Sequence, residues 1–493
     1  MGMSPRGAAR DFTGEIIEKR GPKACFNTPY ADFVETRLIE LAKMGADGFY
    51  FDEVHMPKPF CCCANCRKAF QAETGLEYPA EPDPFDAAYQ KAISFKNTTI
   101  ERLFRRWRRA IHDVNPNCVL LVGSNTYPRM SDRHGTHRLY RIADVMKTEF
   151  NLPARGLRRG QLFETSGMAR PETGAMMALG YAIARDATDG RPPHVWAHNL
   201  PNATHAKFAT AGMIAHGCVA NLDHHEADIP DRELFGPAVA LGNRVAPALA
   251  GKRPLRWATV HYSEWARDHY MPDELLAWRK VLYPTYGAFT TLLHEGLPAT
   301  VITDSQLEQG RLDGSRVLVL PAPKHLTRRM KEAVASFEHA GGTVIEQQPD
   351  WNWTEADAAE AAGAAMMETI AENAGTAPLR VTGGNEKMHA IPFAGSGGEK
   401  LTVALVNDFS WVFTGRRRDR QGKPIPGVEA KINQPPPSPC QDVAIHVAEE
   451  RNVAAAHEMV TGKKLAVQKM DQGVTIPVPD FPTMAVVEID TKP

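Results

Sequence analysis

The stretch G-A-D-G-F-Y-F-D-E-V-H-M-P-K-P-F-C-C-C-A-N-C, residues 45–66, decides the fold of this chain. Its apolar run ends abruptly in two carboxylates, Asp52 and Glu53, and a cluster of cysteines follows at positions 61–66. An apolar run followed by acid is typical of a buried parallel strand that delivers catalytic groups at its carboxyl end. The cysteines are typical of a metal site on the loop that follows such a strand.

The bulk composition excludes several classes of protein. With 493 residues the chain is too long for a single core, and several domains are expected. A net charge of −1 leaves no broad basic surface, so we expect neither nucleic acid nor a membrane as a partner. No stretch is long and apolar enough for a membrane span. The N-terminus has no apolar signal-peptide core, which predicts a cytoplasmic location.

Predicted strands and helices alternate from residue 45 to residue 251. The strands are predicted at 49–51, 118–123, 144–150, 194–200 and 218–223, and the helices at 31–44, 84–114, 133–142, 171–186, 203–215 and 231–249. This alternation predicts a parallel sheet with helices outside it, and a closed barrel needs eight such units. Only five units are predicted, so either the chain starts about three units late or the sheet is open. We expect the first, a (β/α)8-type TIM barrel that is N-terminally truncated. Residues 1–24 then form the tail of a loop whose strand is missing.

Two further domains are predicted downstream. Residues 256–375 alternate again and predict a doubly wound, Rossmann-like domain that resembles class I glutamine amidotransferase domains in outline. No cysteine lies between positions 218 and 440, which excludes thiol amidohydrolase chemistry in that domain. Residues 380–493 predict a small antiparallel β-sandwich. The predicted domains are 1–252 (barrel), 253–378 (doubly wound) and 379–493 (sandwich).

The cysteine cluster predicts a structural metal. Cys61, Cys63 and Cys66 lie in one loop, and Cys25 completes the four soft ligands of a tetrahedral zinc site. Such a site has no open coordination position, so it would stabilise the loop without taking part in catalysis. The clustering argues against a disulfide framework, which would spread the cysteines along the chain. The alternative is an incidental run of cysteines, or a site that has lost its metal.

These motifs together resemble a known family. A Cys-x-Asn-Thr-Pro segment at 25–29, a carboxylate at a strand end and a C-x-C-x-x-C loop resemble the fourth-strand region of the glycoside hydrolase family 42 β-galactosidases. The resemblance implies a carbohydrate substrate, a structural zinc on the four cysteines, and Glu53 as general acid/base. It also implies a trimerisation domain after residue 256, and hence a homo-oligomer in the form of a trimer. The strand ending F-Y-F-D-E is closer to uncharacterised barrel glycosidases related to that family.

The chain departs from the family at the second catalytic carboxylate. The family places its nucleophile at the end of strand seven, and the matching strand here ends in His198-Asn199. Glu149 ends the preceding strand, and Asp223 and Glu226 follow the last one. We favour Glu149, because a pair from strands four and six recurs in other barrel glycosidases.

Two assignments of the carboxylates stay open. In one, Asp52 is the nucleophile and Glu149 the proton donor; in the other, Glu53 is the proton donor. Adjacent residues of a strand point to opposite faces, so only one of Asp52 and Glu53 is expected to point into the site.

Further polar and aromatic residues recur at the predicted carboxyl ends of strands, where a barrel active site lies. The candidates for binding substrate are His55, Asn125, Trp196, His198, Asn199 and Asp223. Taken singly, each could be an ordinary residue of the barrel rim. The sequence predicts a glycosidase, with a non-catalytic sugar-binding or degenerate barrel as the alternative.

Overall fold

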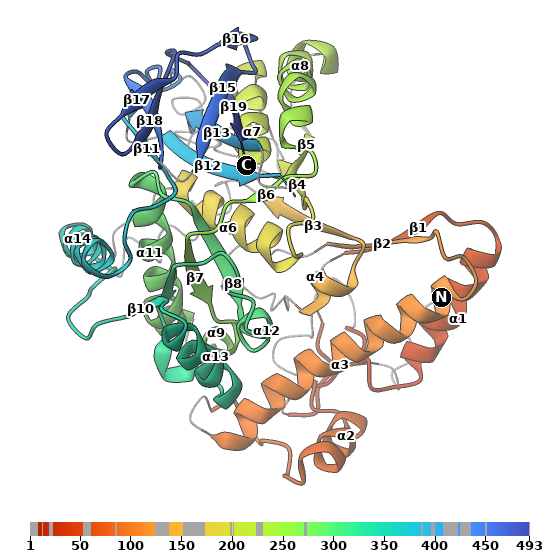
Figure 1. Cartoon of the computed structure of the whole chain (residues 1–493). Coiled ribbons are helices and arrows are strands. Elements are labelled where there is room, and N and C mark those ends of the chain that lie inside the picture. The colour runs from red at the N-terminus through yellow and green to blue at the C-terminus, as the bar shows by residue number, and fades with distance from the viewer. Residues whose placement is uncertain are drawn as a thin grey trace. The chain divides into compact units, whose positions relative to one another are not determined.

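The protein is described here by a computed structural model that divides into two compact units, Met1–Thr148 with Ser263–Leu282, and Glu149–Tyr262 with Tyr283–Pro493 (Figure 1). The structure describes residues 8–11, 13–18, 23–52, 61–83, 86–123, 138–150, 173–197, 200, 202–222, 230–270, 274–385, 388–395, 400–407, 423, 435–448 and 451–492. Among these residues, no helix is long and apolar enough to cross a membrane.

Parallel strands form the centre of the first unit. They are β1 (Gly48–Phe51), β2 (Val119–Gly123) and β3 (Val145–Phe150), which continues into the second unit. The helices are α1 (Tyr30–Lys43), α2 (Ala64–Thr74), α3 (Ala87–His112), α4 (Arg138–Ile142), α9 (Glu264–Tyr270), α10 (Glu274–Ala277) and the π-helical η2 (Trp278–Leu282). β1 pairs with β2 and β2 with β3, all in parallel, which confirms the predicted alternation.

Helix α3 covers one side of β1. It begins at Ala87, later than the predicted start at 84, because the Asp86 side chain accepts hydrogen bonds from the first backbone N–H groups of the helix. The ring of Phe51 lies 5.0 Å from that of Phe104 and 5.7 Å from that of Trp107. This aromatic cluster fixes β1 against the helix.

Two predictions in the N-terminal part were wrong. Residues 1–24 were expected to be a plain loop, yet antiparallel bridges join Ala8 to Ala24 and Arg10 to Ile16. Cys61, Cys63 and Cys66 were predicted to lie in one loop, yet α2 begins among them at residue 64. Its buried residues are Cys66 and Phe70, a stripe too short to give a clear helical period.

The second unit contains a parallel pair of strands and a separate parallel sheet. The pair is β4 (His194–Ala197) and β5 (Val219–Leu222), accompanied by α6 (Thr173–Ala187), α7 (Ala203–Ala215) and α8 (Asp231–Leu249). The separate sheet contains β7 (Ala258–Tyr262), β8 (Ala299–Thr303), β9 (Val317–Leu320) and β10 (Thr343–Glu346), in the order β10-β9-β7-β8.

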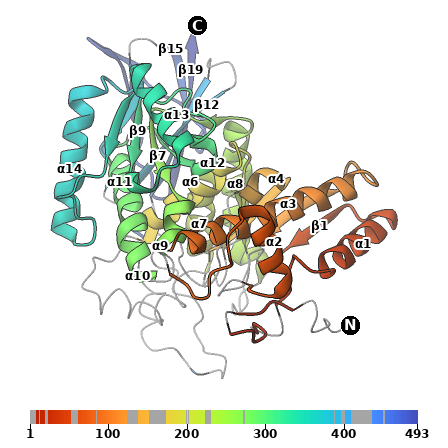
Figure 2. The same ribbon diagram turned by 90° about the horizontal axis from the view of Figure 1, so that it is seen from below.

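Helices lie on both faces of this separate sheet, as the doubly wound prediction requires. Figure 2 shows α11 (Tyr283–His294) and α14 (Ala356–Asn373) on one side of the sheet, and α12 (Asp304–Leu307) and α13 (Arg328–His339) on the other. A 3-10 turn, η3 (Pro323–His325), precedes α13.

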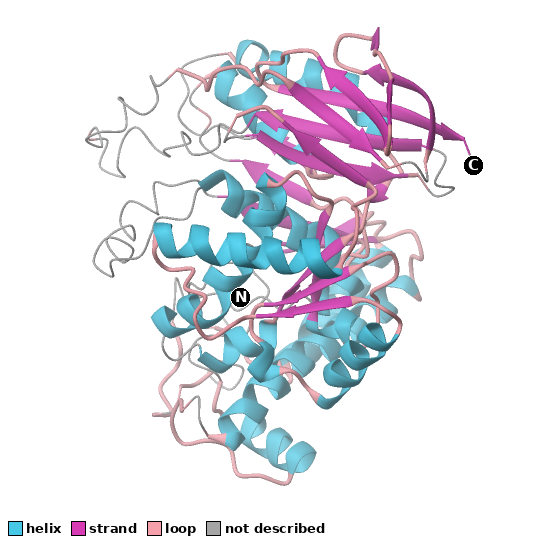
Figure 3. Ribbon diagram, turned by 60° about the vertical axis from the view of Figure 1, so that its left-hand side comes forward, coloured by secondary structure: helices cyan, strands magenta, loops and turns pink. Residues whose placement is uncertain are grey.

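The C-terminal strands form two antiparallel sheets, drawn in magenta in Figure 3. One has the order β11 (Leu379–Thr382), β14 (Val443–Val447), β18 (Gly473–Val478), β17 (Gln468–Met470). The other has the order β16 (Lys463–Lys464), β15 (Asn452–Glu458), β19 (Met484–Lys492), β13 (Lys400–Asn407), β12 (Met388–Ala394), β6 (Arg253–Pro254).

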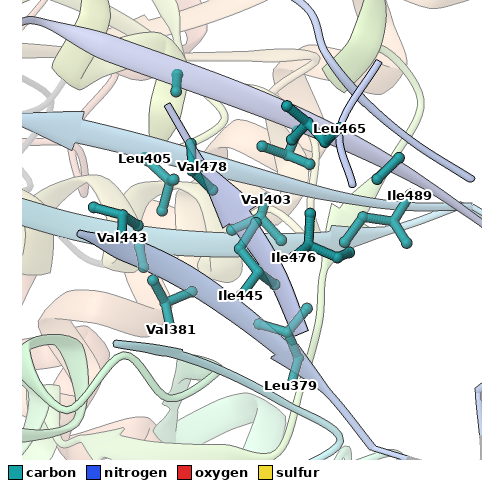
Figure 4. Packing of buried hydrophobic residues seen from close by; sticks show 14 of the residues in the cluster. Leu379, Val381, Val403, Leu405, Val443, Ile445, Leu465, Ile476, Val478 and Ile489 are labelled. Carbon is teal, nitrogen blue, oxygen red and sulfur yellow. The ribbon is translucent and has the colours of Figure 1, made fainter. Parts of the chain in front are cut away.

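The two sheets share one apolar core. Figure 4 shows Ile445 and Ile476 of one sheet packed with Val403 and Ile489 of the other. The second sheet is buried on its other face as well, where Val406 of β13 packs in a cluster with residues of α7 and α8. This double burial explains why β13 is buried along nearly its whole length.

Asp186, at the end of α6, accepts a hydrogen bond from the backbone of the edge strand β8. Its Oδ2 accepts a hydrogen bond of 2.8 Å from the backbone N–H of Val301. Arg185 donates to both carboxylate oxygens, and both side chains are less than 5% exposed. Gln306 donates to the Asp186 carbonyl oxygen at 2.7 Å. The carboxylate thus joins α6 to the sheet at a position where a further strand could otherwise pair.

His216, at the end of α7, is a buried imidazole. Its ring lies 5.3 Å from that of Tyr181 and 5.6 Å from that of His389, and Arg185 donates to its carbonyl oxygen. Burial, and then the charges of His389 and Arg185, hold the pKa of His216 well below its usual value.

Replacing Asp186 by alanine should strongly destabilise the protein. The change leaves the Arg185 guanidinium and the Val301 N–H buried without this acceptor, a loss of about 3–5 kcal/mol. Calorimetric unfolding of Asp186→Ala beside Asp313→Ala, an exposed aspartate, measures the effect. Equal melting temperatures for the two variants would contradict the proposed role of Asp186.

Stability should fall as the pH drops below about 6.5. The unfolded chain then binds a proton at His216 that the folded protein excludes, so the loss reaches up to about 2 kcal/mol at pH 5. Melting temperatures at pH 7.5 and pH 5 should differ less for His216→Gln than for the wild type. His339→Gln, which alters an exposed histidine, is the control. An unchanged difference in His216→Gln would refute this account.

Candidate active site and metal centre

Four buried cysteines converge in the first unit. Cys25 lies just before α1, and Cys61, Cys63 and Cys66 lie at the start of α2. Their sulfur atoms all lie within 4.8 Å of one another, with Cys25 Sγ at 3.5 Å from Cys63 Sγ and 3.4 Å from Cys66 Sγ. Four thiolates around a tetrahedral zinc at 2.3 Å would be ~3.8 Å apart. The predicted cluster is thus assembled, and it could hold a metal ion.

The four thiols cannot ionise independently at this spacing. The pKa of Cys61 and that of Cys63 are both lowered by hydrogen bonding to Cys25. The pKa of Cys25 is raised by hydrogen bonding to Cys61, and that of Cys66 by hydrogen bonding to Cys25. A divalent metal resolves this conflict, because it stabilises every sulfur as a thiolate. The donor set therefore fits a soft or borderline cation.

Groups around the cluster support it. The backbone N–H of Arg10 donates to Cys61 Sγ and the Asn27 amide donates to Cys66 Sγ, both at 3.4 Å. N–H donors of this kind stabilise metal-bound thiolates and orient them. Cys62 is outside the cluster, and burial raises the pKa of its thiol to about 12.

A second group of side chains lies together on β1, β2 and β3, the parallel strands of the first unit. The Tyr50 hydroxyl donates a hydrogen bond of 2.7 Å to Asp52 Oδ1. Lys147 of β3 holds its ammonium 4.6 Å from the centre of the Tyr50 ring. Gly123 of β2 lies directly beneath that ring, since a Cβ there would be 2.5 Å from the Tyr50 hydroxyl oxygen. These residues come from three neighbouring strands of the first unit.

The structure describes part of the predicted catalytic set. Asp52 is exposed, immediately beyond the end of β1. Glu149 lies in β3, two positions after Lys147. Trp196 lies in β4 of the second unit and is half-buried. The residues outside the described part of the chain are Glu53, His55, Asn125, His198, Asn199, Asp223 and Glu226.

The described strands end where the candidate residues begin. β2 ends at Gly123, two positions before Asn125, and β4 ends at Ala197, directly before His198. β5 ends at Leu222, directly before Asp223. The sequence positions of the candidates thus follow the carboxyl ends of parallel strands, where active sites of α/β folds lie.

Sequence reasoning missed several contributors. Tyr50 and Gly123 looked like ordinary strand residues, and Arg10 and Asn27 like loop residues. The period of two along β1 could have indicated that Tyr50 shares a side with Asp52. No local signal indicates that Arg10, 51 residues before Cys61, lies beside it.

No protein-family model and no curated protein matches this chain. Solved structures do match. The α-L-fucosidase isoenzyme 2 of Paenibacillus thiaminolyticus has a TM-score of 0.67 and 14% identity, covering 99% of this chain and 85% of that one. A β-galactosidase of Bacillus circulans sp. alkalophilus has a TM-score of 0.66 and 11% identity, covering 98% and 86%.

A glycoside hydrolase family 42 β-galactosidase is also similar. A catalytic mutant of Gan42B from G. stearothermophilus has a TM-score of 0.65 and 11% identity, covering 99% of this chain and 86% of that one. The resemblance predicted from the cysteines and the strand-end carboxylates is confirmed at the level of the fold. This chain therefore has a mixed α/β fold like that of these enzymes, with sheets of parallel strands and with antiparallel sheets at its C-terminus.

Loss of one cluster cysteine should abolish metal binding and lower stability. Purified wild-type protein should contain about one metal ion per chain by elemental analysis, and Cys66→Ser much less than one. Cys62→Ser, a buried cysteine of the same loop outside the cluster, is the matched control. Equal metal content in the three proteins would count against a metal centre.

Proposed function

We propose that this protein is a glycoside hydrolase that cleaves a β-galactoside or a related sugar. The observation that carries the proposal is its fold likeness to enzymes named as β-galactosidases and an α-L-fucosidase. The positions of polar residues after the carboxyl ends of β1, β2, β4 and β5 support it. In this proposal residues 1–252 are part of a (β/α)8-type barrel, followed by a trimerisation-like domain at 253–378 and a sandwich at 379–493.

Two carboxyl groups are proposed to carry the chemistry. Asp52 or Glu53, at the end of β1, provides one, and Glu149 of β3 provides the other. A retaining glycosidase needs its carboxyl groups about 5 Å apart, one as nucleophile and one as proton donor. The substrate is proposed to bind through the candidates named above: His55, Asn125, Trp196, His198, Asn199 and Asp223.

The metal on the four cysteines is proposed to be zinc, with a structural role. An all-sulfur site of four ligands matches structural zinc and leaves no coordination position for a substrate. The cluster would then stabilise the end of the loop that leaves β1. From the family resemblance, the protein is also proposed to form a homo-oligomer, namely a trimer.

Hydrolysis of nitrophenyl glycosides should identify the activity. We expect Glu149→Gln to lose more kcat/KM with nitrophenyl than with dinitrophenyl substrates, by a factor of about 100, because the better leaving group needs no proton donor. Glu53→Gln tests the other assignment in the same way. Glu332→Gln, an exposed glutamate on α13, should behave as the wild type. Absence of turnover across the panel, with all variants alike, would reject the proposal.

A non-catalytic sugar-binding protein is the alternative. It is favoured by His198 and Asn199, which follow β4 where the family resemblance calls for a carboxylate. Titration calorimetry that detects galactose or fucose binding without any hydrolysis of the corresponding glycosides would support this alternative.

A further inference from the structure

The residues around Asp52 occupy one side of the sheet in the first unit. β1 pairs in parallel with β2, with Tyr50 opposite Leu121. Laterally paired residues of a sheet point to the same side, and so do alternate residues along a strand. Tyr50, Asp52 and Gly123 therefore share a side, and Lys147 joins them because it pairs with Gly123.

The other side of β1 is already filled. Phe51 points there and stacks with Phe104 and Trp107 of α3, which are both buried. The side of Tyr50 and Asp52 is thus the one on which β1 can offer a charged group to a polar ligand.

Tyr50 is held in place from three directions. Its hydroxyl donates to Asp52 Oδ1 at 2.7 Å, and the ammonium of Lys147 lies 4.6 Å from its ring centre. The ring lies so close to Gly123 that a Cβ there would meet a ring carbon at 2.8 Å and the hydroxyl oxygen at 2.5 Å. A glycine is required at 123 for the ring to lie flat across β2.

We propose that Tyr50 is a positioning residue that fixes Asp52, and that Asp52 and not Glu53 is the carboxylate of β1 that reacts. This inference rests on the proposed glycosidase function. With Oδ1 held by Tyr50, Oδ2 attacks the anomeric carbon and forms an ester bond to the sugar. The bond from that carbon to the leaving oxygen breaks, and the oxygen takes a proton from the acid. Water then hydrolyses the ester and restores the carboxylate.

Kinetics of four variants test the proposal. Asp52→Asn should lose about 1,000-fold or more in kcat, and Glu53→Gln less than about tenfold. Tyr50→Phe should lose about ten- to 100-fold in kcat with KM nearly unchanged, because the sugar still binds while the nucleophile is misplaced. Gly123→Ala keeps the hydroxyl but displaces the ring, and should match Tyr50→Phe.

Two controls separate positioning from general damage. Tyr30→Phe removes another tyrosine hydroxyl from the first unit, and Gly212→Ala adds a methyl group where nothing lies within 4 Å. Both should retain wild-type kcat. The proposal is overturned if Tyr50→Phe also retains it, or if Glu53→Gln loses more than Asp52→Asn.

Crystal structures of wild type and Tyr50→Phe provide a readout that does not need turnover. We expect one Asp52 rotamer in the wild type and more than one in the variant. If the wild type hydrolyses no glycoside, the proposed function fails, and with it the inference that Asp52 reacts. The inference that Tyr50 positions Asp52 is then tested by the rotamers alone. One unchanged Asp52 rotamer in both structures overturns that positioning role.

Discussion

Close contact among four sulfur atoms is the constraint on which the candidate site depends. The cluster joins Cys25, before α1, to the start of α2, and these two segments share no sheet. Eight residues, 53–60, separate Asp52 from Cys61 in the sequence, so the cluster follows soon after the end of β1. Thiolates this close repel one another. A bound cation would offset that repulsion and stabilise the folded segment.

The sequence predicts the elements well wherever apolar residues keep a regular period. α7 and α8 have the predicted bounds, and the parallel order of β1, β2 and β3 follows from strand and helix alternation. The cysteine motifs and the carboxylate that follows the first strand led to the resemblance that the solved structures confirm at the level of the fold. The cysteine spacing correctly predicted the four sulfur atoms that converge, since soft ligands in a short loop have few other uses.

Other features depend on contacts that no local pattern records. The N–H of Arg10 reaches Cys61 across 51 residues, and the Lys147 ammonium reaches the ring of Tyr50 from two strands away. Helix α2 buries few apolar residues, so its period is weak. The sequence also carried no sign that Phe51 of β1 packs against Phe104 and Trp107 of a helix about 50 residues later in the chain.

The Asp186 carboxylate that binds β8 bears on how this edge strand avoids uncontrolled pairing with strands of other chains. An edge strand offers unpaired N–H and C=O groups to any neighbouring chain, and natural sheets block this with inward-facing charges. Asp186 acts in this way, since it occupies the Val301 N–H with an oxygen that cannot continue a β-ladder. Partial opening that separates α6 from β8 would uncover a template for intermolecular strands, so the resistance of this sheet to aggregation is set by a neighbouring helix.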